Sequence, residues 1–421
     1  MAEITNYKCM NCGGALEFSS EKQKLMCVDC QSEYDVSEFE QAAAATGQQQ
    51  YQAKTDEWDV HGEGLLVYEC KNCGGEVVGD ETMASTKCPY CENPIVISSK
   101  FEGSLKPDLV IPFKLDKKAA KIELVKHVNS IRLAPGAFKA GNHIKELKGV
   151  YVPFWLFDAN CHASGSYEGQ KIHRHSDAKY NYKETQYYDV YREGDMSFEN
   201  VPADASSKMD DDLMDSIEPY DVSAAVPYSS AYMAGYLADR YDVSPEQCQP
   251  RADKRMEQTA RDLIRGQVKN YDSVSEKSHT FNKLTSSYKY ALYPVWILNT
   301  IWNGEKFVFA MNGQTGKLVG NVPYSKGKFF GVLFGVLAAL WAIMLGVLAV
   351  TSHFSTGTIV GTGVASVIIA LIVAFSMKGK TKSVHKGTQA MNFVVNGSLR
   401  ITNSHDNFIR KTEEKTAKSS S

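Results

Sequence analysis

Eight of the ten cysteines occur as four Cys-x-x-Cys pairs, and this pattern constrains the fold more than any other feature. The first set is Cys9, Cys12, Cys27 and Cys30. The second set repeats the same spacing 61 residues later, at Cys70, Cys73, Cys88 and Cys91. Two residues between cysteines allow one tight turn to direct both sulfurs at a single ion. The sequence therefore predicts two zinc ribbons, and the repeated text YKCMNCGG and YECKNCGG indicates an internal duplication.

Each predicted site has four thiolate ligands, so no position stays open for water or substrate, and both ions are expected to be structural. Metal binding supplies about 10–16 kcal/mol to such small modules. A redox dithiol would need one pair beside a βαβ pattern, whereas rubredoxin-type iron, with similar knuckles, stays open as the alternative metal. Thiolate ligands also imply a reducing compartment. Gly13 and Gly74 follow a knuckle, where a left-handed backbone conformation is expected.

The charge of the ribbon region bears on its partners. Residues 1–100 hold seventeen Asp and Glu against seven Lys, and each zinc ion with four thiolates adds a charge of about −2. Affinity for a phosphate backbone depends on Lys and Arg displacing counterions, so this surface is expected to repel DNA and RNA. Contact with a protein partner is the preferred interpretation.

Two apolar runs predict membrane-spanning helices. Residues 329–350 carry no charge and would extend about 33 Å as a helix, enough for the hydrocarbon core of a bilayer. A second uncharged run covers residues 358–377, and the short link between the runs predicts a helical hairpin. The alternative is a buried core helix. Two adjacent uncharged runs of this length argue against that alternative.

Lysines flank the predicted hairpin on one side only. The expected contacts with lipid headgroups are Lys326, Lys328, Lys378, Lys380, Lys382 and Lys386. The link between the helices has neither Lys nor Arg, so both termini are expected to face the cytosol, with the hairpin in the plasma membrane. Attraction to anionic lipid is worth about 1 kcal/mol per lysine, although these lysines could also serve only to fix topology.

Helix and strand signals alternate in the middle of the chain and predict an α+β domain. The segment that begins at Asp116 has a capping residue and places Ile122, Val125 and Val128 on one apolar helical face. The segment EKFVFAMNGQTGKLVG predicts a hairpin that turns at Asn312-Gly313.

A further helix start is predicted at Ser244-Pro245, where Gln247 completes a capping box. Pro250 is expected to break or kink this helix. The C-terminal segment NFVVNGSLRIT resembles a small hairpin with an Asn-Gly turn, and the last residues, KTEEKTAKSSS, are expected to be disordered.

The fold class that follows is a multi-domain protein with two small β zinc ribbons, an α+β soluble domain and a two-helix transmembrane hairpin. The expected divisions are a first ribbon at 1–40, a linker at 41–64, a second ribbon at 65–100, the α+β cytosolic domain at 101–325, the transmembrane hairpin at 326–378 and a basic cytosolic tail at 379–421.

The sequence lacks four common catalytic motifs: the G-x-x-x-x-G-K-[ST] phosphate loop, G-x-S-x-G, H-E-x-x-H and G-x-G-x-x-G. His173 and His175 could share one face of a strand as a metal pair, but a polar surface is the preferred interpretation. Cys161-His162 and the Asp210–212 run are likewise interpreted as core or surface. The chain is not expected to be an enzyme, and in particular not a helicase or NTPase.

Several segments together resemble a known family. These are the doubled knuckles, PFWLFDA, YPVWILNT, MNGQTGK and the terminal hairpin. They are similar, over nearly the whole chain, to Gram-positive bacterial membrane proteins labelled TFIIB-type zinc-ribbon proteins, sometimes primosomal-helicase-like. The resemblance supplies no established activity, and the missing phosphate loop argues against a helicase. Some relatives are encoded near phage-shock and SPFH-type membrane-stress proteins, which implies a role in a membrane-surface assembly.

The function expected from these features is a membrane-anchored scaffold or adaptor that docks protein partners at the cytosolic face of the plasma membrane. One alternative is a membrane-tethered nucleic-acid-binding factor, for replication or transcription. The other is an enzyme with an unrecognised site in residues 101–325.

Overall fold

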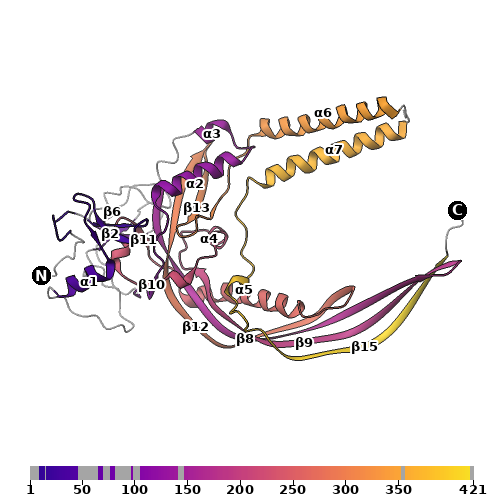
Figure 1. Ribbon diagram of the computed structural model, residues 1–421, viewed down its shortest axis with the longest axis horizontal. Helices are drawn as coiled ribbons and strands as arrows, with labels where there is room; N and C mark the ends of the chain where they lie inside the picture. The colour runs from indigo at the N-terminus through magenta and orange to yellow at the C-terminus, as the bar shows by residue number, and fades with distance from the viewer. Residues whose placement is uncertain are drawn as a thin grey trace. The chain divides into compact units, whose positions relative to one another are not determined.

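The structure is a computed structural model that divides the chain into two compact units. Unit 1 comprises Met1–Pro153, Ser206–Arg240 and Leu292–Lys386, and unit 2 comprises Phe154–Ala205, Tyr241–Ala291 and Gly387–Ser421. The ribbon in Figure 1 shows the elements of both. The residues that the structure describes are 9–14, 16–45, 65–69, 76–80, 96–97, 105–140, 147–351 and 356–417.

Unit 1 begins with a small antiparallel sheet. It consists of β1 (Leu16–Ser19), β2 (Lys24–Cys27) and β3 (Glu33–Tyr34) and is followed by helix α1 (Val36–Ala45). In β1 and β2, Leu16, Phe18, Leu25 and Cys27 alternate with more exposed residues and are buried. This period-2 pattern builds the predicted first ribbon, and α1 spans the predicted boundary between ribbon and linker at residue 40.

Three further strands follow in the predicted second ribbon. They are β4 (Leu65–Glu69), β5 (Glu76–Asp80) and β6 (Val96–Ile97), which pair in antiparallel fashion with β4 in the middle. Strand β5 also pairs with β11 (Leu237–Asp239). The four cysteines of this ribbon lie outside the described residues, so its metal site stays a prediction.

The body of unit 1 is a mixed sheet with helices against it. Its strands are β7 (Leu109–Val110), β10 (Val226–Pro227), β11, the start of β8 (Lys148–Ser176), the end of β12 (Ser273–Trp302), β13 (Glu305–Asn312) and β14 (Leu318–Gly320). Strands β8 and β11 run parallel. Four buried aromatic residues meet in the core: Phe113, Tyr151, Tyr236 and Trp296. The hairpin predicted at Asn312-Gly313 is confirmed as β13 and β14.

The buried face of helix α2 (Lys117–Ser130) was predicted wrongly. Asp116 caps the helix as expected, by accepting a hydrogen bond from the Ala119 amide. However, α2 buries Ala120, Leu124 and Val128 and leaves Ile122 and Val125 exposed. Residues at i, i+4 and i+8 form one stripe, and the small Ala120 allows this stripe to approach the body closely. Helix α3 (Gly136–Ala140) packs through Phe138 on Phe307 and Phe309 of β13, whereas α4 (Asp211–Ile217) lies beside Val308, on the other face of that strand.

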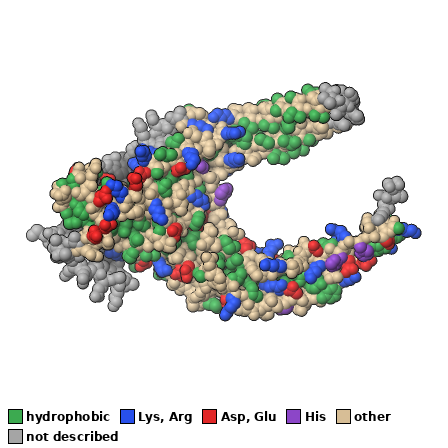
Figure 2. All heavy atoms as spheres, in the orientation of Figure 1, with side chains coloured by type: hydrophobic (Ala, Val, Ile, Leu, Met, Phe, Trp, Pro, Cys, Tyr) green, Lys and Arg blue, Asp and Glu red, His purple; other side chains and the backbone are tan. Residues whose placement is uncertain are grey.

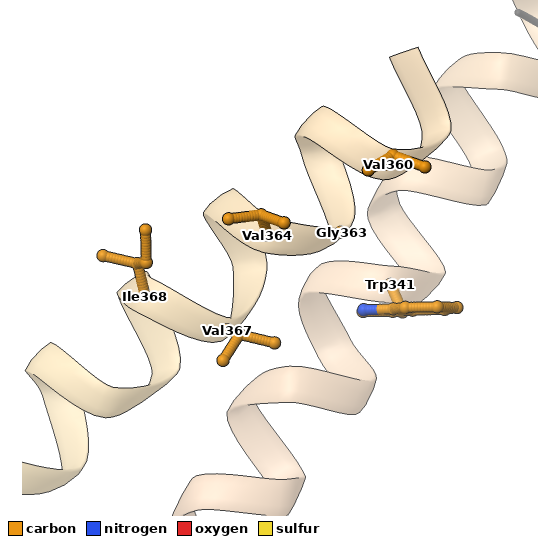
Figure 3. A pocket seen from close by; sticks show the side chains of 6 residues that line it. All are labelled: Trp341, Val360, Gly363, Val364, Val367 and Ile368. Atoms are coloured by element: carbon orange, nitrogen blue, oxygen red, sulfur yellow. The ribbon is translucent and has the colours of Figure 1, made fainter. Parts of the chain in front are cut away.

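Two long helices end unit 1, α6 (Lys326–Thr351) and α7 (Thr356–Gly379), and both are long and apolar enough to cross a membrane. They form the hairpin that the sequence predicts. Helix α7 buries a stripe of small residues: Ser366, Ala370 and Ala374. By contrast, Gly331 and Gly335 of α6 have open space beside them. Near the middle of the hairpin, Trp341 of α6 and five residues of α7 line an apolar pocket: Val360, Gly363, Val364, Val367 and Ile368 (Figure 3).

Unit 2 is built on long strands: the remainder of β8 and β12, together with β9 (Tyr180–Asp204) and β15 (Arg400–Ala417). Helix α5 (Pro245–Arg265) starts with the predicted capping box of Ser244 and Gln247. The expected break at Pro250 is wrong, because α5 continues through it. The helix buries apolar side chains from Cys248 to Ile264, and this burial outweighs the one backbone hydrogen bond that proline removes.

The C-terminal hairpin and the disordered end were also predicted wrongly. The Asn-Gly turn exists, since Gly397 has a φ of +75° and the Ser398 amide donates to the Val395 carbonyl. The strand that leaves it, β15, pairs with β9 rather than with the preceding residues. Residues 411–417, expected to be disordered, belong to this strand. The backbone N–H and C=O groups of residues 411–417 thus form hydrogen bonds with a strand that is distant in sequence, which the neighbouring residues do not indicate.

Candidate metal centre

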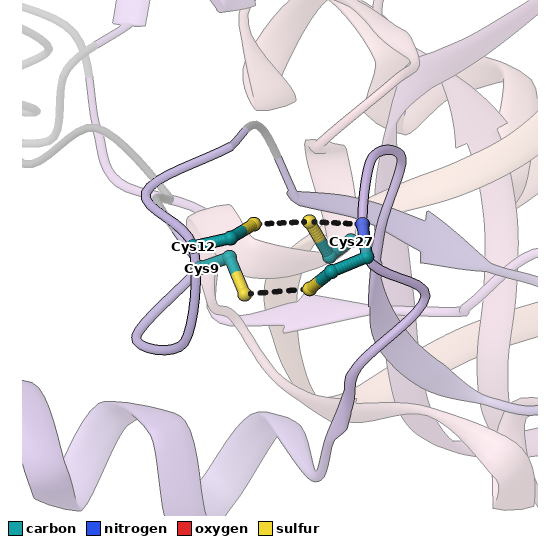
Figure 4. A group of neighbouring side chains, drawn as sticks. Cys9, Cys12 and Cys27 are labelled. Carbon is teal, nitrogen blue, oxygen red and sulfur yellow. Dashed lines mark hydrogen bonds between the residues drawn. The ribbon is translucent and has the colours of Figure 1, made fainter.

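The structure brings together the first set of predicted ligands: Cys9, Cys12, Cys27 and Cys30. Their four sulfur atoms all lie within 4.8 Å of one another, with Cys9 and Cys30 separated by 3.5 Å and Cys12 and Cys27 by 3.4 Å (Figure 4). In a tetrahedral site with Zn–S bonds of about 2.3 Å, sulfur atoms lie about 3.8 Å apart. The arrangement can therefore hold one ion, and the donor set of four sulfurs suits zinc.

Two tight turns aim the sulfurs inward. Gly13 has a φ of +73°, as the sequence predicts, and its amide donates to the Cys9 carbonyl at 2.8 Å. In the second knuckle, Gln31 takes the same role with a φ of +60°, and its amide donates to the Cys27 carbonyl. Sequence reasoning missed Gln31, because only glycine adopts this conformation without steric cost.

Neighbouring polar groups lie against the sulfurs. The Tyr34 hydroxyl lies 3.1 Å from the Cys9 sulfur, and the Ser32 hydroxyl lies 3.1 Å from the Cys30 sulfur. The Cys30 amide donates to the Cys27 sulfur at 3.5 Å. Such donors stabilise thiolates and orient them towards a metal ion. Tyr34 and Ser32 are outer-shell residues that the cysteine pattern alone does not reveal.

The thiols differ in acidity. Burial would raise the pKa of Cys9, but the Tyr34 hydroxyl and nearby backbone amides outweigh it and lower this pKa to about 6. Hydrogen bonds from Ser32 lower the pKa of Cys30. At Cys12, the amide of Gly14 lowers the pKa, but hydrogen bonds shared with the neighbouring thiols outweigh it and raise this pKa to about 12. An incoming ion would displace the remaining protons from the group.

The metal end of this ribbon is open to solvent. Cys9 and Cys27 are buried, whereas Met10 and Val28, which lie inside the two knuckles, are 59% and 56% exposed. The opposite side packs on the body of unit 1. There Phe18 meets Tyr232 edge to face, and the Phe18 amide donates to the Ala234 carbonyl at 3.0 Å.

The body of unit 1 also holds the base of the helical hairpin. The Ser325 amide donates to the Leu133 carbonyl at 2.8 Å, and the Val322 amide donates to the Thr381 carbonyl at 2.9 Å. The Lys328 side chain donates to the Ala134 carbonyl at 2.6 Å. These bonds join the start of α6 and the end of α7 to the sheet and to the turn after α2.

The six predicted lipid-contacting lysines lie at this base, except for Lys386, which follows the segment that His385 joins to Ser216 of α4. Five of them are exposed: Lys326, Lys328, Lys380, Lys382 and Lys386. The sixth, Lys378, is half-buried, with its ammonium group 4.7 Å from the centre of the Tyr324 ring. Figure 2 shows basic side chains at the base of the hairpin, where α6 begins and α7 ends, and a hydrophobic surface along the helices beyond.

The remaining polar candidates form no second metal group within the described part of the chain. His175 stacks on Tyr182. Cys161 is buried, and burial raises its pKa to about 12. The ring of His162 lies between Asp195 and Glu193, at 2.7 and 2.8 Å, and so pairs with carboxylates rather than with the thiol.

Comparison with known proteins gives one informative match. The chain is 32% identical over 342 residues to "Uncharacterized protein YdjG" of Bacillus subtilis (strain 168), which covers 80% of this chain and 96% of the relative. The chain belongs to the YdjG family. No family model matches it, so the resemblance to TFIIB-type zinc-ribbon proteins stays an expectation, and no solved structure matches. The relative's printed name gives no activity.

Proposed function

We propose that this YdjG-family protein is a membrane-anchored scaffold that docks protein partners at the cytosolic face of the plasma membrane. The first ribbon holds a structural zinc ion and presents its metal end to the partner. The second ribbon holds a second zinc ion. The hairpin of α6 and α7 crosses the bilayer with both chain termini in the cytosol.

The observation that carries this proposal is the mounting of the first ribbon. Its sheet is packed on the body of unit 1 through Phe18, and the same body holds the base of the two apolar helices. The metal end, with Met10 and Val28, stays exposed. A closed four-thiolate centre performs no chemistry on a substrate, so a rigid and exposed recognition surface is the role that it suits.

The charge of this surface defines the partner. Residues 9–45 carry seven Asp and Glu against two Lys, and a zinc ion with four thiolates adds a charge of about −2. A protein surface with basic side chains around an apolar contact would complement it, whereas a nucleic acid would be repelled.

The lysines at the base of the hairpin support the orientation. They flank both helices at the end held by unit 1, which is where headgroups would lie if the helices cross the bilayer. At about 1 kcal/mol each, they would attract the anionic lipids of the cytosolic leaflet. In that setting, lipid chains would fill the apolar pocket beside Trp341.

A matched pair of variants tests the docking surface. Met10→Lys with Val28→Lys adds two charges at the metal end, and Ile122→Lys with Val125→Lys adds two charges on the exposed face of α2. Partners recovered by crosslinking in intact cells should fall at least ten-fold with the first pair only. Equal partner recovery from both pairs, at unchanged metal content, would rule out the metal end as the docking site.

A further inference from the structure

Strand β15 forms an open edge of the sheet in unit 2. It pairs with β9 along its whole length, and no strand pairs with its other edge among the residues that the structure describes. In Figure 1, β15 is the yellow strand that follows β9. An edge of this length presents a row of backbone N–H and C=O groups that can accept another strand.

The second half of β15 is the part suited to pairing. Irregular pairing with β9 occurs between Ile401 and Asn403 and again between Phe408 and Arg410, and bulges of this kind turn an edge away from a partner. From Arg410 to Ala417 the register with β9 is regular. Beside this stretch, Phe408 and Ile409 are 57% and 47% exposed.

The charges of this stretch are self-complementary. Arg410 and Lys411 precede Thr412, and Glu413 and Glu414 follow it. We infer that two copies of the chain pair through antiparallel β15 edges, with the two-fold axis at Thr412. In this register Arg410 lies opposite Glu414 of the second copy, and Lys411 lies opposite Glu413, each pair occurring twice.

Directly opposite residues project from the same face of an antiparallel sheet, where opposite charges stabilise the pairing and like charges oppose it. A shift of the register by one residue in one direction leaves only the pairing of Arg410 with Glu413. A shift in the other direction leaves Lys411 with Glu414 and sets Arg410 against Lys415. The charges therefore select one register and disfavour its neighbours.

The side chains involved are already held upright on the sheet. Lys411 pairs with Glu184, and Glu414 accepts from Lys183 at 3.2 Å. The Arg410 guanidinium lies 4.7 Å from the centre of the Tyr187 ring. Because these contacts limit side-chain motion, pairing costs less conformational entropy.

A second copy is the occupant that this pattern favours over an unrelated strand. The same stretch supplies both halves of the charge pattern, which is the requirement of an isologous two-fold interface. The sheets of the two copies, each ending in β9 and β15, would join into one continuous sheet. This inference goes beyond the proposed scaffold role and depends on neither the metal nor the docking surface.

Site-directed disulfides test the register in the full-length protein in its native membranes. Because closely and widely spaced pairs alternate along an antiparallel ladder, either Thr412→Cys with itself or Lys411→Cys mixed with Glu413→Cys lies at the closer spacing. We expect at least one combination to form a disulfide-linked dimer under mild oxidation. Asn407→Cys is the matched control, because its two copies would lie about 34 Å apart. Wild-type protein reports any background from native cysteines.

Charge exchange provides the second test. Glu413→Lys with Glu414→Lys makes all four charged residues of 410–414 basic, and Arg410→Glu with Lys411→Glu makes all four acidic. Each variant alone should lose at least nine-tenths of the dimer, and co-expression of the two, with different tags, should restore a mixed dimer. The mixed dimer also demonstrates that both variants fold.

Three results would overturn the inference: no disulfide-linked dimer at Thr412 or at the mixed positions, equal linkage at Asn407, or no mixed dimer from the exchanged charges. Loss of partner docking through the Met10 and Val28 surface would leave all of these measurements unchanged. Failure of one proposal is therefore distinguishable from failure of the other.

Discussion

Unit 1 and unit 2 differ in what holds their distinctive parts in place. In unit 1, the four cysteines of the first ribbon converge on a site for one ion, and α6 and α7 expose long apolar faces suited to lipid. In unit 2, long strands pair with one another, and β9 packs against α5. There Tyr167, Val190 and Phe198 are fully or nearly fully buried. We therefore expect the first ribbon and the hairpin of unit 1 to depend on agents outside the chain, and unit 2 to depend on the chain itself.

This difference has consequences for experiments. A small ribbon with three short strands buries little apolar surface, so its stability should follow the metal. The hairpin helices should follow the bilayer. The stability of unit 2 should depend on neither metal nor lipid. It should change only when its own packing is altered. Perturbations chosen by this rule should separate the two units.

The largest effect is expected from removal of a metal ligand. Cys27→Ser deletes a buried thiolate and with it a large part of the roughly 10–16 kcal/mol that a structural zinc ion supplies. The first ribbon should become sensitive to protease, while unit 2 keeps its protease resistance. Cys248→Ser is the control, because this buried cysteine of unit 2 can keep its hydrogen bond to the Asp204 carbonyl as serine. Equal protease patterns in the two variants would contradict the expected difference between the first ribbon and unit 2.

A cavity in unit 2 should give the next largest effect. Phe198 is 1% exposed and pairs with Ala159 across β8 and β9, so Phe198→Ala should cost unit 2 about 3–5 kcal/mol. Hydrogen exchange should rise across β8, β9 and β15 while the metal content stays constant. A loss of metal from this variant would show that the ribbon depends on unit 2.

A charge in the hairpin tests its dependence on lipid. Val364 of α7 is 55% exposed within the apolar run, and Val364→Arg should cost about 2.5–3.5 kcal/mol of insertion free energy. The fraction that resists alkaline extraction from membranes should fall, and Val364→Leu should behave as the wild type. Undiminished membrane retention of the arginine variant would argue against a spanning helix.

The two knuckles of the first ribbon should respond to substitution in opposite directions. Gly13 and Gln31 both have positive φ, and nothing lies within 4 Å of a β-carbon placed on Gly13. Gly13→Ala should therefore cost about 1–2 kcal/mol through backbone strain alone. Gln31→Gly should relieve strain at the second knuckle and tighten metal binding. Competition with a chromogenic chelator measures both changes, and a shift of equal sign in the two variants would be inconsistent with this account.

The smallest effect is a pH dependence confined to unit 2. Hydrogen bonds to Asp195 and Glu193 raise the pKa of His162 above its usual value, although burial opposes them. This contribution is fully present below the unfolded pKa of about 6.5 and is lost as pH rises through the higher folded value. Unit 2 should therefore melt at a lower temperature above that pH. His162→Gln should flatten the dependence of the melting temperature on pH. If this variant keeps the wild-type pH dependence, other titratable groups cause it.

The four-cysteine group and the two apolar helices of unit 1 were predictable from the sequence. Metal coordination and membrane insertion leave local signals, namely the Cys-x-x-Cys spacing and uncharged runs such as residues 329–350. The capping box at Ser244 was equally visible, because its partners lie three residues apart. Each of these features is decided by neighbours in the chain.

The features that sequence reasoning missed depend on distant partners. Strand β15 pairs with β9, more than two hundred residues away, and the sequence of β15 alone does not indicate which strand it pairs with. The buried stripe of α2 is chosen by the surface that it meets, so Ile122 and Val125 could not be recognised as exposed. The Tyr34 hydroxyl reaches the sulfur of Cys9, 25 residues earlier in the chain, only once the ribbon has folded.

Metal stoichiometry tests the central claim most directly. Full-length protein purified from membranes should contain close to two zinc ions per chain by inductively coupled plasma mass spectrometry. Cys9→Ser combined with Cys27→Ser should lower this to close to one without releasing the protein from the membrane. Wild-type protein without bound metal, or a zinc content unchanged by the double substitution, would contradict the account.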